Sequence, residues 1–152
     1  MQKNSTESKE LYTLLCQCLN SISEFIYQSV ILEESYPSLA SLSEAIALSE
    51  LKHYRLLSHV ARMHGIDHKI NFRVKNSFNI PDSQDPLSLF SLFAEEKRER
   101  AKKYSTLSLS PVFCQKCSAT LASLADDERS HCEMILSETY KIKNDNFGNN
   151  KI

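Results

Sequence analysis

Apolar residues recur at alternating steps of three and four along four separate stretches of this chain, and this spacing most constrains its fold. The stretches cover about residues 8–34, 37–64, 86–109 and 111–142. Such spacing places the apolar residues on one face of an α-helix. The chain also has two glycines in 152 residues, which argues against strands and tight hairpins because these use glycine often. We therefore predict an all-α fold, an antiparallel four-helix bundle with one core.

Prolines and one glycine mark where the predicted helices begin and end. Pro37 ends the first helix by penalising the helical state of the residue before it, and Gly65 is placed to cap the second helix. Pro86 follows Asp85, an arrangement typical of a helix start. The long connection over residues 66–85 is predicted to cross the length of the bundle between the second and third helices.

The predicted domain boundaries follow from this helix assignment. Residues 1–7 are expected to form a flexible N-terminus, and residues 8–142 the bundle. Residues 143–152 are polar and rich in asparagine, so we expect a flexible C-terminal tail.

Charge and composition restrict the classes of partner and the compartment. The net charge of −1 gives no basic excess, so we expect neither nucleic acid nor a membrane as a partner. The polar N-terminus resembles no secretory signal, and the five cysteines are an odd number. Both features predict a cytoplasmic protein with reduced thiols. Cys114-x-x-Cys117 lacks the second pair that a structural zinc site or a rubredoxin-type iron site uses, which favours ordinary, partly buried thiols.

Charged side chains interrupt the apolar faces of three predicted helices. At 100° per residue, Glu50 and His53 fall within the apolar face of the second helix. Glu128 and His131 do the same on the fourth helix, and Glu96 does so on the third. Carboxylates buried together cost free energy and repel one another, and a multivalent cation removes both penalties. Glutamate oxygen and histidine nitrogen are suitable ligands for such a cation, so this pattern predicts a buried metal site.

A weak internal duplication relates the two halves of the chain. Glu96 precedes Glu128 by 32 residues, and the same step back from Glu50 reaches Cys18 in the first helix. Cys18 is therefore a candidate metal ligand at a position where symmetry predicts a carboxylate, although a small apolar core residue is the commoner role of a buried cysteine. The nearest carboxylate, Glu24, falls outside the apolar face of that helix.

The motifs "SELKHY", "EEKRERAKKY" and "LADDERSHCEMI" resemble the ferritin-like di-iron carboxylate proteins, and the rubrerythrins most closely. The resemblance covers about residues 8–142. In that superfamily, two helices each supply one glutamate and the other two each supply Glu-x-x-His. The resemblance implies five metal ligands, with Glu99 as a second metal glutamate of the third helix and Tyr104 as the tyrosine five residues beyond it. The five implied ligands are Glu50, His53, Glu96, Glu128 and His131.

The function implied by the resemblance is a non-haem di-iron oxidoreductase that reduces peroxide or dioxygen. Glu50 and Glu128 would bridge two irons per chain and, with Tyr104, form the catalytic group. Manganese and zinc also suit such ligands. We expect a homodimer or a higher homo-oligomer. A separate electron-donor protein is expected because the chain has no rubredoxin-like domain.

Two alternatives remain open from the sequence. The first is a ferritin-like protein that binds or stores iron without fast turnover, which the missing glutamate of the first helix favours. The second is a degenerate bundle that binds no metal and acts in protein contact.

Overall fold

The computed structural model describes residues 5–66, 68–69 and 85–148. These residues form four α-helices and no strand: α1 (Thr6–Ile31), α2 (Pro37–Met63), α3 (Pro86–Ser108) and α4 (Gln115–Gly148). The predicted all-α four-helix architecture is confirmed.

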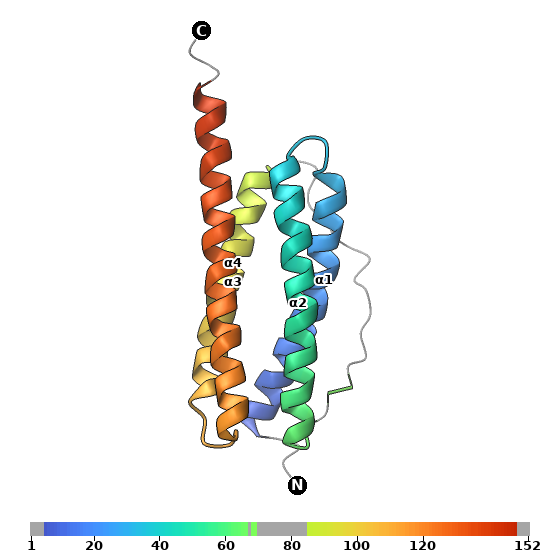
Figure 1. The fold of residues 1–152 in the computed structure, drawn as a ribbon, viewed down its shortest axis with the longest axis vertical. Helices are drawn as coiled ribbons and strands as arrows, with labels where there is room; N and C mark the ends of the chain where they lie inside the picture. The colour runs from blue at the N-terminus through green and yellow to red at the C-terminus, as the bar shows by residue number, and fades with distance from the viewer. Residues whose placement is uncertain (1–4, 67, 70–84, 149–152) are drawn as a thin grey trace.

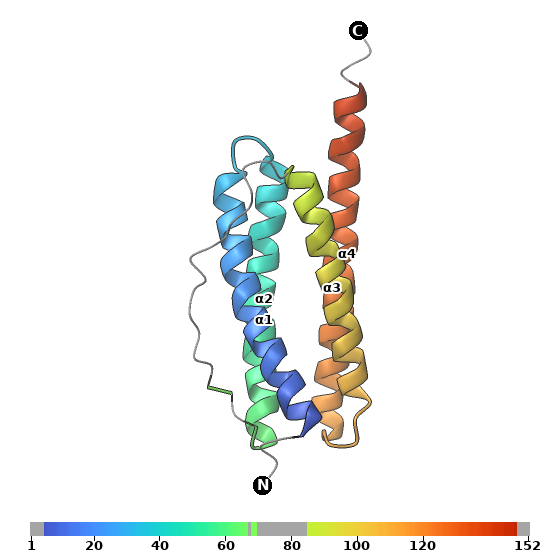
Figure 2. The same ribbon diagram turned by 180° about the vertical axis from the view of Figure 1, so that it is seen from behind.

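The helices pack as two antiparallel hairpins, α1 with α2 and α3 with α4, and α2 also contacts α4 (Figures 1 and 2). In Figure 1, α2 ends at the lower end of the bundle, whereas α3 begins at the upper end. These two helices therefore run in the same direction. The predicted crossover over residues 66–85 lies largely outside the described residues.

The N-terminal helix begins earlier than predicted. The Ser5 hydroxyl accepts a hydrogen bond from the Ser8 amide at 3.2 Å, so Ser5 caps α1. Thr6 and Glu7, which the prediction placed in the N-terminal segment, are helical, and residues 1–4 of that segment lie outside the described residues. The cause is the Ser5 cap, which supplies an acceptor to the first turn.

The predicted cap at Gly65 is confirmed. Gly65 has a φ of 62°, its amide donates to Arg62 O at 3.2 Å, and the Ile66 amide donates to Ala61 O at 2.9 Å. These two bonds define a Schellman motif, which satisfies carbonyl groups at the end of α2. Ile66 is buried against the lower part of the core.

The fourth helix begins later and ends later than predicted. Its first residue is Gln115, because the Ser110 hydroxyl caps a turn over residues 111–113 rather than the helix. The helix then continues to Gly148 and extends beyond the other three helices (Figure 1). Residues 143–148 of the predicted tail are therefore helical, and residues 149–152 lie outside the described residues. Polar composition removes core packing there, but each added residue still gains a backbone hydrogen bond.

The bundle core consists of two apolar clusters separated by a polar layer. The lower cluster contains Leu15, Leu57 and Leu121, and the upper cluster contains Phe25 and Phe90 among others. Along α2, α3 and α4, buried charged or imidazole side chains lie between the members of the two clusters. This polar layer comprises Glu50, His53, Lys97, Arg100, Glu128 and His131.

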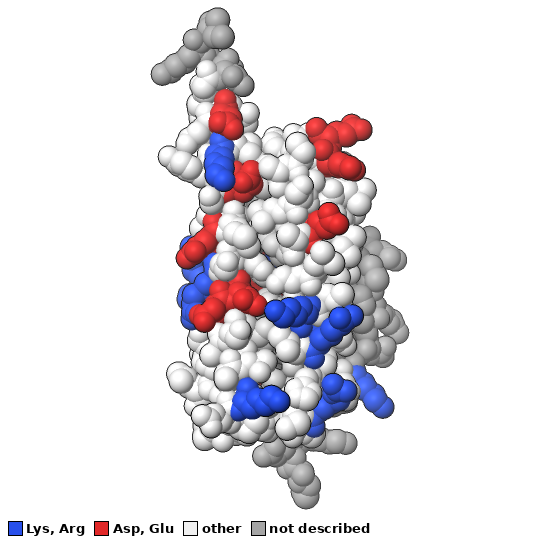
Figure 3. Space-filling view, viewed as in Figure 1, with Lys and Arg blue, Asp and Glu red and all other residues white. Residues whose placement is uncertain are grey.

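The described surface carries both signs of charge. Figure 3 shows basic side chains mainly over the lower part of one face and acidic side chains over its middle and upper parts. Within the described ranges, every helix is too short or too polar to cross a membrane.

Candidate metal centre

Glu50, His53 and Glu128 meet in the polar layer. Glu50 and His53 are one turn apart on α2, and Glu128 faces them from α4. All three side chains are fully buried. One ligand atom from each lies within 4.8 Å of the other two. The sequence prediction that these three residues share a buried site is consistent with this arrangement.

Both ring nitrogens of His53 face carboxylates. Nδ1 lies 3.1 Å from Glu128 Oε1 and 3.9 Å from Glu50 Oε1, and Nε2 lies 3.1 Å from Asp127 Oδ2. Burial acts to lower the pKa of His53, but the hydrogen bond that His53 donates to Glu128 and the charges of Glu50 and Glu128 outweigh it, so the pKa is raised. The structure therefore favours a protonated imidazolium that donates from both nitrogens.

His131 lies beside His53, and its pKa is shifted in the opposite direction. The two rings stack with centroids 5.6 Å apart, and His131 is 5% exposed. Among the described residues, no hydrogen-bond partner lies within reach of its Nδ1. Burial, together with the Lys97 ammonium, lowers the pKa of His131 to about 4. His131 is therefore a neutral imidazole with a buried, unpartnered nitrogen.

Two cations of α3 enter the same layer. The Lys97 ammonium contacts Glu50 and lies 3.3 Å from Glu128 Oε2. Arg100 Nη1 lies 3.1 Å from Glu50 Oε2 and 3.8 Å from Glu128 Oε1, and its Nη2 donates to Ser21 Oγ at 2.8 Å. Burial acts to raise the pKa of Glu50, but Lys97 and Arg100 outweigh it and lower that pKa to about 2. Side-chain cations therefore supply the positive charge that the sequence analysis assigned to a metal ion.

Glu96 was predicted to face the core, and this prediction is wrong. Glu96 is exposed, and Lys97 is buried in its place. The inward face of α3 includes Phe93, Lys97, Arg100 and Tyr104, so the predicted helix phase was displaced by about one residue. In the observed helix phase, Lys97 lies one turn after the buried Phe93, whereas Glu96 lies one turn after the exposed Leu92.

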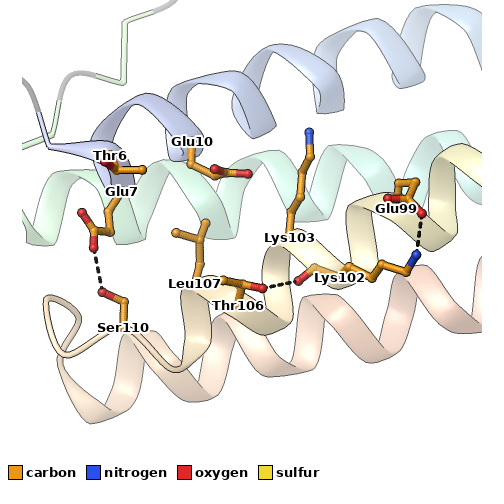
Figure 4. Close-up of a pocket in the computed structure, with 9 residues that line it drawn as sticks. All are labelled: Thr6, Glu7, Glu10, Glu99, Lys102, Lys103, Thr106, Leu107 and Ser110. Atoms are coloured by element: carbon orange, nitrogen blue, oxygen red, sulfur yellow. Dashed lines mark hydrogen bonds and ion pairs between the residues drawn. The ribbon is translucent and has the colours of Figure 1, made fainter.

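Glu99 also lies outside the polar layer. It is exposed and lies 2.6 Å from Lys102 Nζ. Figure 4 shows Glu99 and Lys102 beside a hollow between the first turns of α1 and the last turns of α3. The volume of this hollow is about 240 Å³. The position of Glu99 contradicts its predicted place among the metal ligands.

Cys18 and Tyr104 are buried next to each other, with Sγ and the phenol oxygen 3.5 Å apart. Burial raises the pKa of Cys18 to about 12 and raises the pKa of Tyr104 well above its ordinary value. Both side chains are therefore protonated and neutral. Neither belongs to the group of close ligand atoms around Glu128.

Glu50, His53 and Glu128 provide one group of close candidate ligand atoms in the polar layer. The carboxylates of Glu50 and Glu128 and a ring nitrogen of His53 form a mixed oxygen and nitrogen donor set. His131 lies outside this group of close ligand atoms, and its ring stacks on that of His53.

A second ion would need carboxylates from α1 and α3. The buried positions of these helices beside the polar layer hold Cys18, Ser21, Lys97 and Arg100. The carboxylates that α1 and α3 offer are Glu24, which is half-buried, and Glu96, which is exposed, and the two interact electrostatically.

Sequence reasoning missed Lys97 and Asp127 and left the partners of Arg100 open. A usable signal for Lys97 was present, because the residues one turn before it, Phe93 and Ala94, are both apolar. Asp127 is 43% exposed, and its contact with His53 has no signature in helical spacing.

Comparisons with family models, with characterised proteins and with solved structures give no match to this chain.

Proposed function

We propose that this protein binds one divalent transition-metal ion per chain in the polar layer. The ligands are Glu50 and His53 of α2 together with Glu128 and His131 of α4. The proposed function is metal binding in a ferritin-like bundle, without the two-iron chemistry of the rubrerythrins that the motifs resemble.

The observation that carries this proposal is the buried Nδ1 of His131, which has no hydrogen-bond partner among the described residues. A buried polar atom without a partner costs free energy, and such atoms are uncommon in native proteins. His131 lies outside the group of ligand atoms within 4.8 Å of one another, so a metal ion bound by Glu50, His53 and Glu128 would give this nitrogen a partner once the His131 side chain moves toward it. Its neutral state also supports the proposal, because imidazole binds a metal through an unprotonated nitrogen.

Lys97 competes with the proposed ion. The ammonium and a metal ion would occupy the same region between the two carboxylates, and their charges repel. Metal binding therefore requires the Lys97 side chain to withdraw, and requires His53 to release one proton. A bound ion would supply Lewis acidity inside the bundle.

The proposal is tested by adding Mn(II) to metal-free protein and following the free ion by electron paramagnetic resonance. Anaerobic addition of Fe(II) provides the second probe. We expect one ion per chain for each metal. Glu128→Gln and His131→Gln should each weaken binding by about tenfold or more, the usual result of losing a ligand or its support.

Matched controls are available on α3. Glu96→Gln and Glu99→Gln remove carboxylates that the resemblance implied as ligands but that are exposed, so both should bind as the wild type does. Two ions per chain, or a loss of binding in either control, would contradict the proposal.

The second candidate is a bundle that binds no metal and acts in protein contact. The ion pairs of Lys97 and Arg100 with Glu50 favour it, because they already compensate the buried carboxylates. A ligand that binds the native state raises its stability. A melting temperature that stays unchanged when Mn(II) or Fe(II) is added would support this candidate.

The predicted di-iron oxidoreductase is less well supported. The residues of α3 that face the polar layer are cations rather than carboxylates. This function would be supported if hydrogen peroxide rapidly oxidised the anaerobic Fe(II)-loaded protein and if that protein held two irons per chain.

A further inference from the structure

A second cluster of metal-binding side chains lies at the lower end of the bundle, where α2 ends and α4 begins. His64 directly follows the last residue of α2. Cys114 precedes the first residue of α4, and Cys117 lies in its first turn. One nitrogen and two sulfur atoms from these residues all lie within 4.8 Å of one another.

The backbone fixes His64 in this cluster. The positive φ of Gly65 and the Schellman hydrogen bonds end α2 at this point. The His64 ring packs edge-on against Phe113, with centroids 5.1 Å apart and an interplanar angle of 86°. Its Nε2 lies 3.5 Å from the amide nitrogen of Cys114, so the ring nitrogen faces the cysteine pair.

The two cysteines differ in environment. The Cys117 amide donates to Cys114 Sγ at 3.4 Å, so Cys114 caps α4. Backbone hydrogen bonding from Cys117 lowers the pKa of Cys114, whereas burial raises the pKa of Cys117 to about 11. Cys114 is exposed and Cys117 is buried. The Cys114 side chain is thus accessible to solvent, whereas the Cys117 side chain connects the cluster to the core.

We propose that His64, Cys114 and Cys117 bind one Zn²⁺ ion, with water as the fourth ligand. Zinc is tetrahedral in such sites, with bonds of about 2.3 Å to sulfur and about 2.0 Å to nitrogen. Ligand atoms around it are therefore separated by roughly 3.3–3.8 Å, so the present cluster needs small movements to bind the ion. Thiolates favour Zn²⁺ over the harder Mn²⁺.

This site joins the two hairpins, because His64 belongs to the first hairpin and both cysteines belong to the second. Zinc bound there stabilises the packing of α2 against the start of α4, since the ligands come together only in the native state. The zinc site is independent of the proposed metal centre of the polar layer, because the two sites share no ligand.

The test uses Co²⁺ as a spectroscopic substitute for Zn²⁺ in the reduced full-length protein. We expect a thiolate-to-cobalt charge-transfer band that saturates at one ion per chain, and we expect Zn²⁺ to abolish it. Cys114→Ser should reduce the band to about half its intensity, because one of the two thiolates is lost, and should weaken Zn²⁺ binding at least tenfold. Serine is itself a preferred helix cap, so this variant preserves the start of α4 and separates ligand loss from misfolding.

Further variants define the ligand set. His64→Ala should weaken Zn²⁺ binding at least tenfold, whereas Cys16→Ser changes a cysteine outside the cluster and should bind normally. Glu128→Gln should leave the cobalt band intact even where Mn(II) binding is lost. The proposal is overturned if the reduced wild type shows no charge-transfer band, or if Cys114→Ser retains the full intensity of the band.

Discussion

The ammonium group of Lys97 contacts the carboxylate of Glu50 in the bundle interior, where the two residues are 1% and 0% exposed. The same ammonium lies 3.3 Å from Glu128 Oε2. A side-chain cation thus occupies the region between two carboxylates that the sequence analysis assigned to a metal ion.

Replacing Lys97 with methionine should destabilise the metal-free protein. The change preserves most of the side-chain volume but leaves Glu50 and Glu128 with Arg100 as the principal compensating cation. Removing one partner from a buried ion pair typically costs about 3 kcal/mol. Urea unfolding at pH 7, in the presence of a chelator, measures the difference in the free energy of unfolding.

Two further variants give this prediction its controls. Lys102→Met removes an exposed lysine of the same helix that pairs with Glu99, and should cost less than about 1 kcal/mol. Lys97→Met combined with Glu50→Gln should recover part of the lost stability, because the unpaired charge is removed as well. An equal loss from Lys97→Met and Lys102→Met would show that the buried contact contributes little.

Glu24 should make the stability of the native state depend on pH. It is partly buried on α1, and the charged groups around it are Glu96, Lys97 and Arg100 of α3. Burial, followed by the charge of Glu96, raises the pKa of Glu24 from 4.5 to about 7, although Arg100 and Lys97 oppose this. The protonated form is therefore favoured on folding. Its contribution to stability is complete below pH 4.5 and is lost as the pH rises through about 7.

Glu24→Gln should raise the free energy of unfolding by about 1 kcal/mol at pH 8, and should have little effect at pH 4.5. The expected gain is smaller than the full linkage value because the side chain is partly solvated. Urea unfolding of both proteins at the two pH values measures it. Glu33→Gln is the control, at an exposed position next to the C-terminal end of α1. It should change the free energy of unfolding equally at the two pH values. A gain for Glu24→Gln at pH 4.5 equal to that at pH 8 would exclude the charge as its cause.

Gly65→Ala should destabilise the bundle by about 1 kcal/mol. No atom lies within 4 Å of an added Cβ, so the cost arises from the φ of 62°, which side chains rarely adopt. Gly148→Ala is the matched control, since that glycine is helical and its added Cβ is also free of contacts. Thermal unfolding should show a lower melting temperature for Gly65→Ala alone. Equal melting temperatures for the two variants would argue against the Schellman cap as a stabilising feature.

The four helices and the inward positions of the two Glu-x-x-His pairs were predictable because apolar spacing repeats strongly on α2 and α4. The phase of α3 was harder to predict, because Glu95, Glu96 and Lys97 are consecutive and each interrupts an apolar pattern. Glu96 was chosen because, at 100° per residue, it falls within an apolar face that was taken to include Leu92, but Leu92 is exposed in the structure. Packing against Phe25 instead selects Lys97, whose ammonium lies 5.3 Å from the ring centroid.

The cluster around His64 was not predictable from spacing. His64 and Cys114 are fifty positions apart in the chain, and no periodicity relates the end of one hairpin to the start of the next. The contact depends on where Gly65 ends α2 and where Cys114 begins α4. A prediction would have required both helix ends to be correct within a residue, and the predicted start of the fourth helix was several residues early.

Competition between Lys97 and the metal ion is the central claim, and Mn(II) binding by the Lys97→Met variant tests it most directly. Removing the ammonium should tighten Mn(II) binding by about tenfold or more relative to the wild type, a change of ~1.4 kcal/mol, whereas Lys102→Met should leave the affinity unchanged. Failure of both the wild type and Lys97→Met to bind Mn(II) would contradict the account.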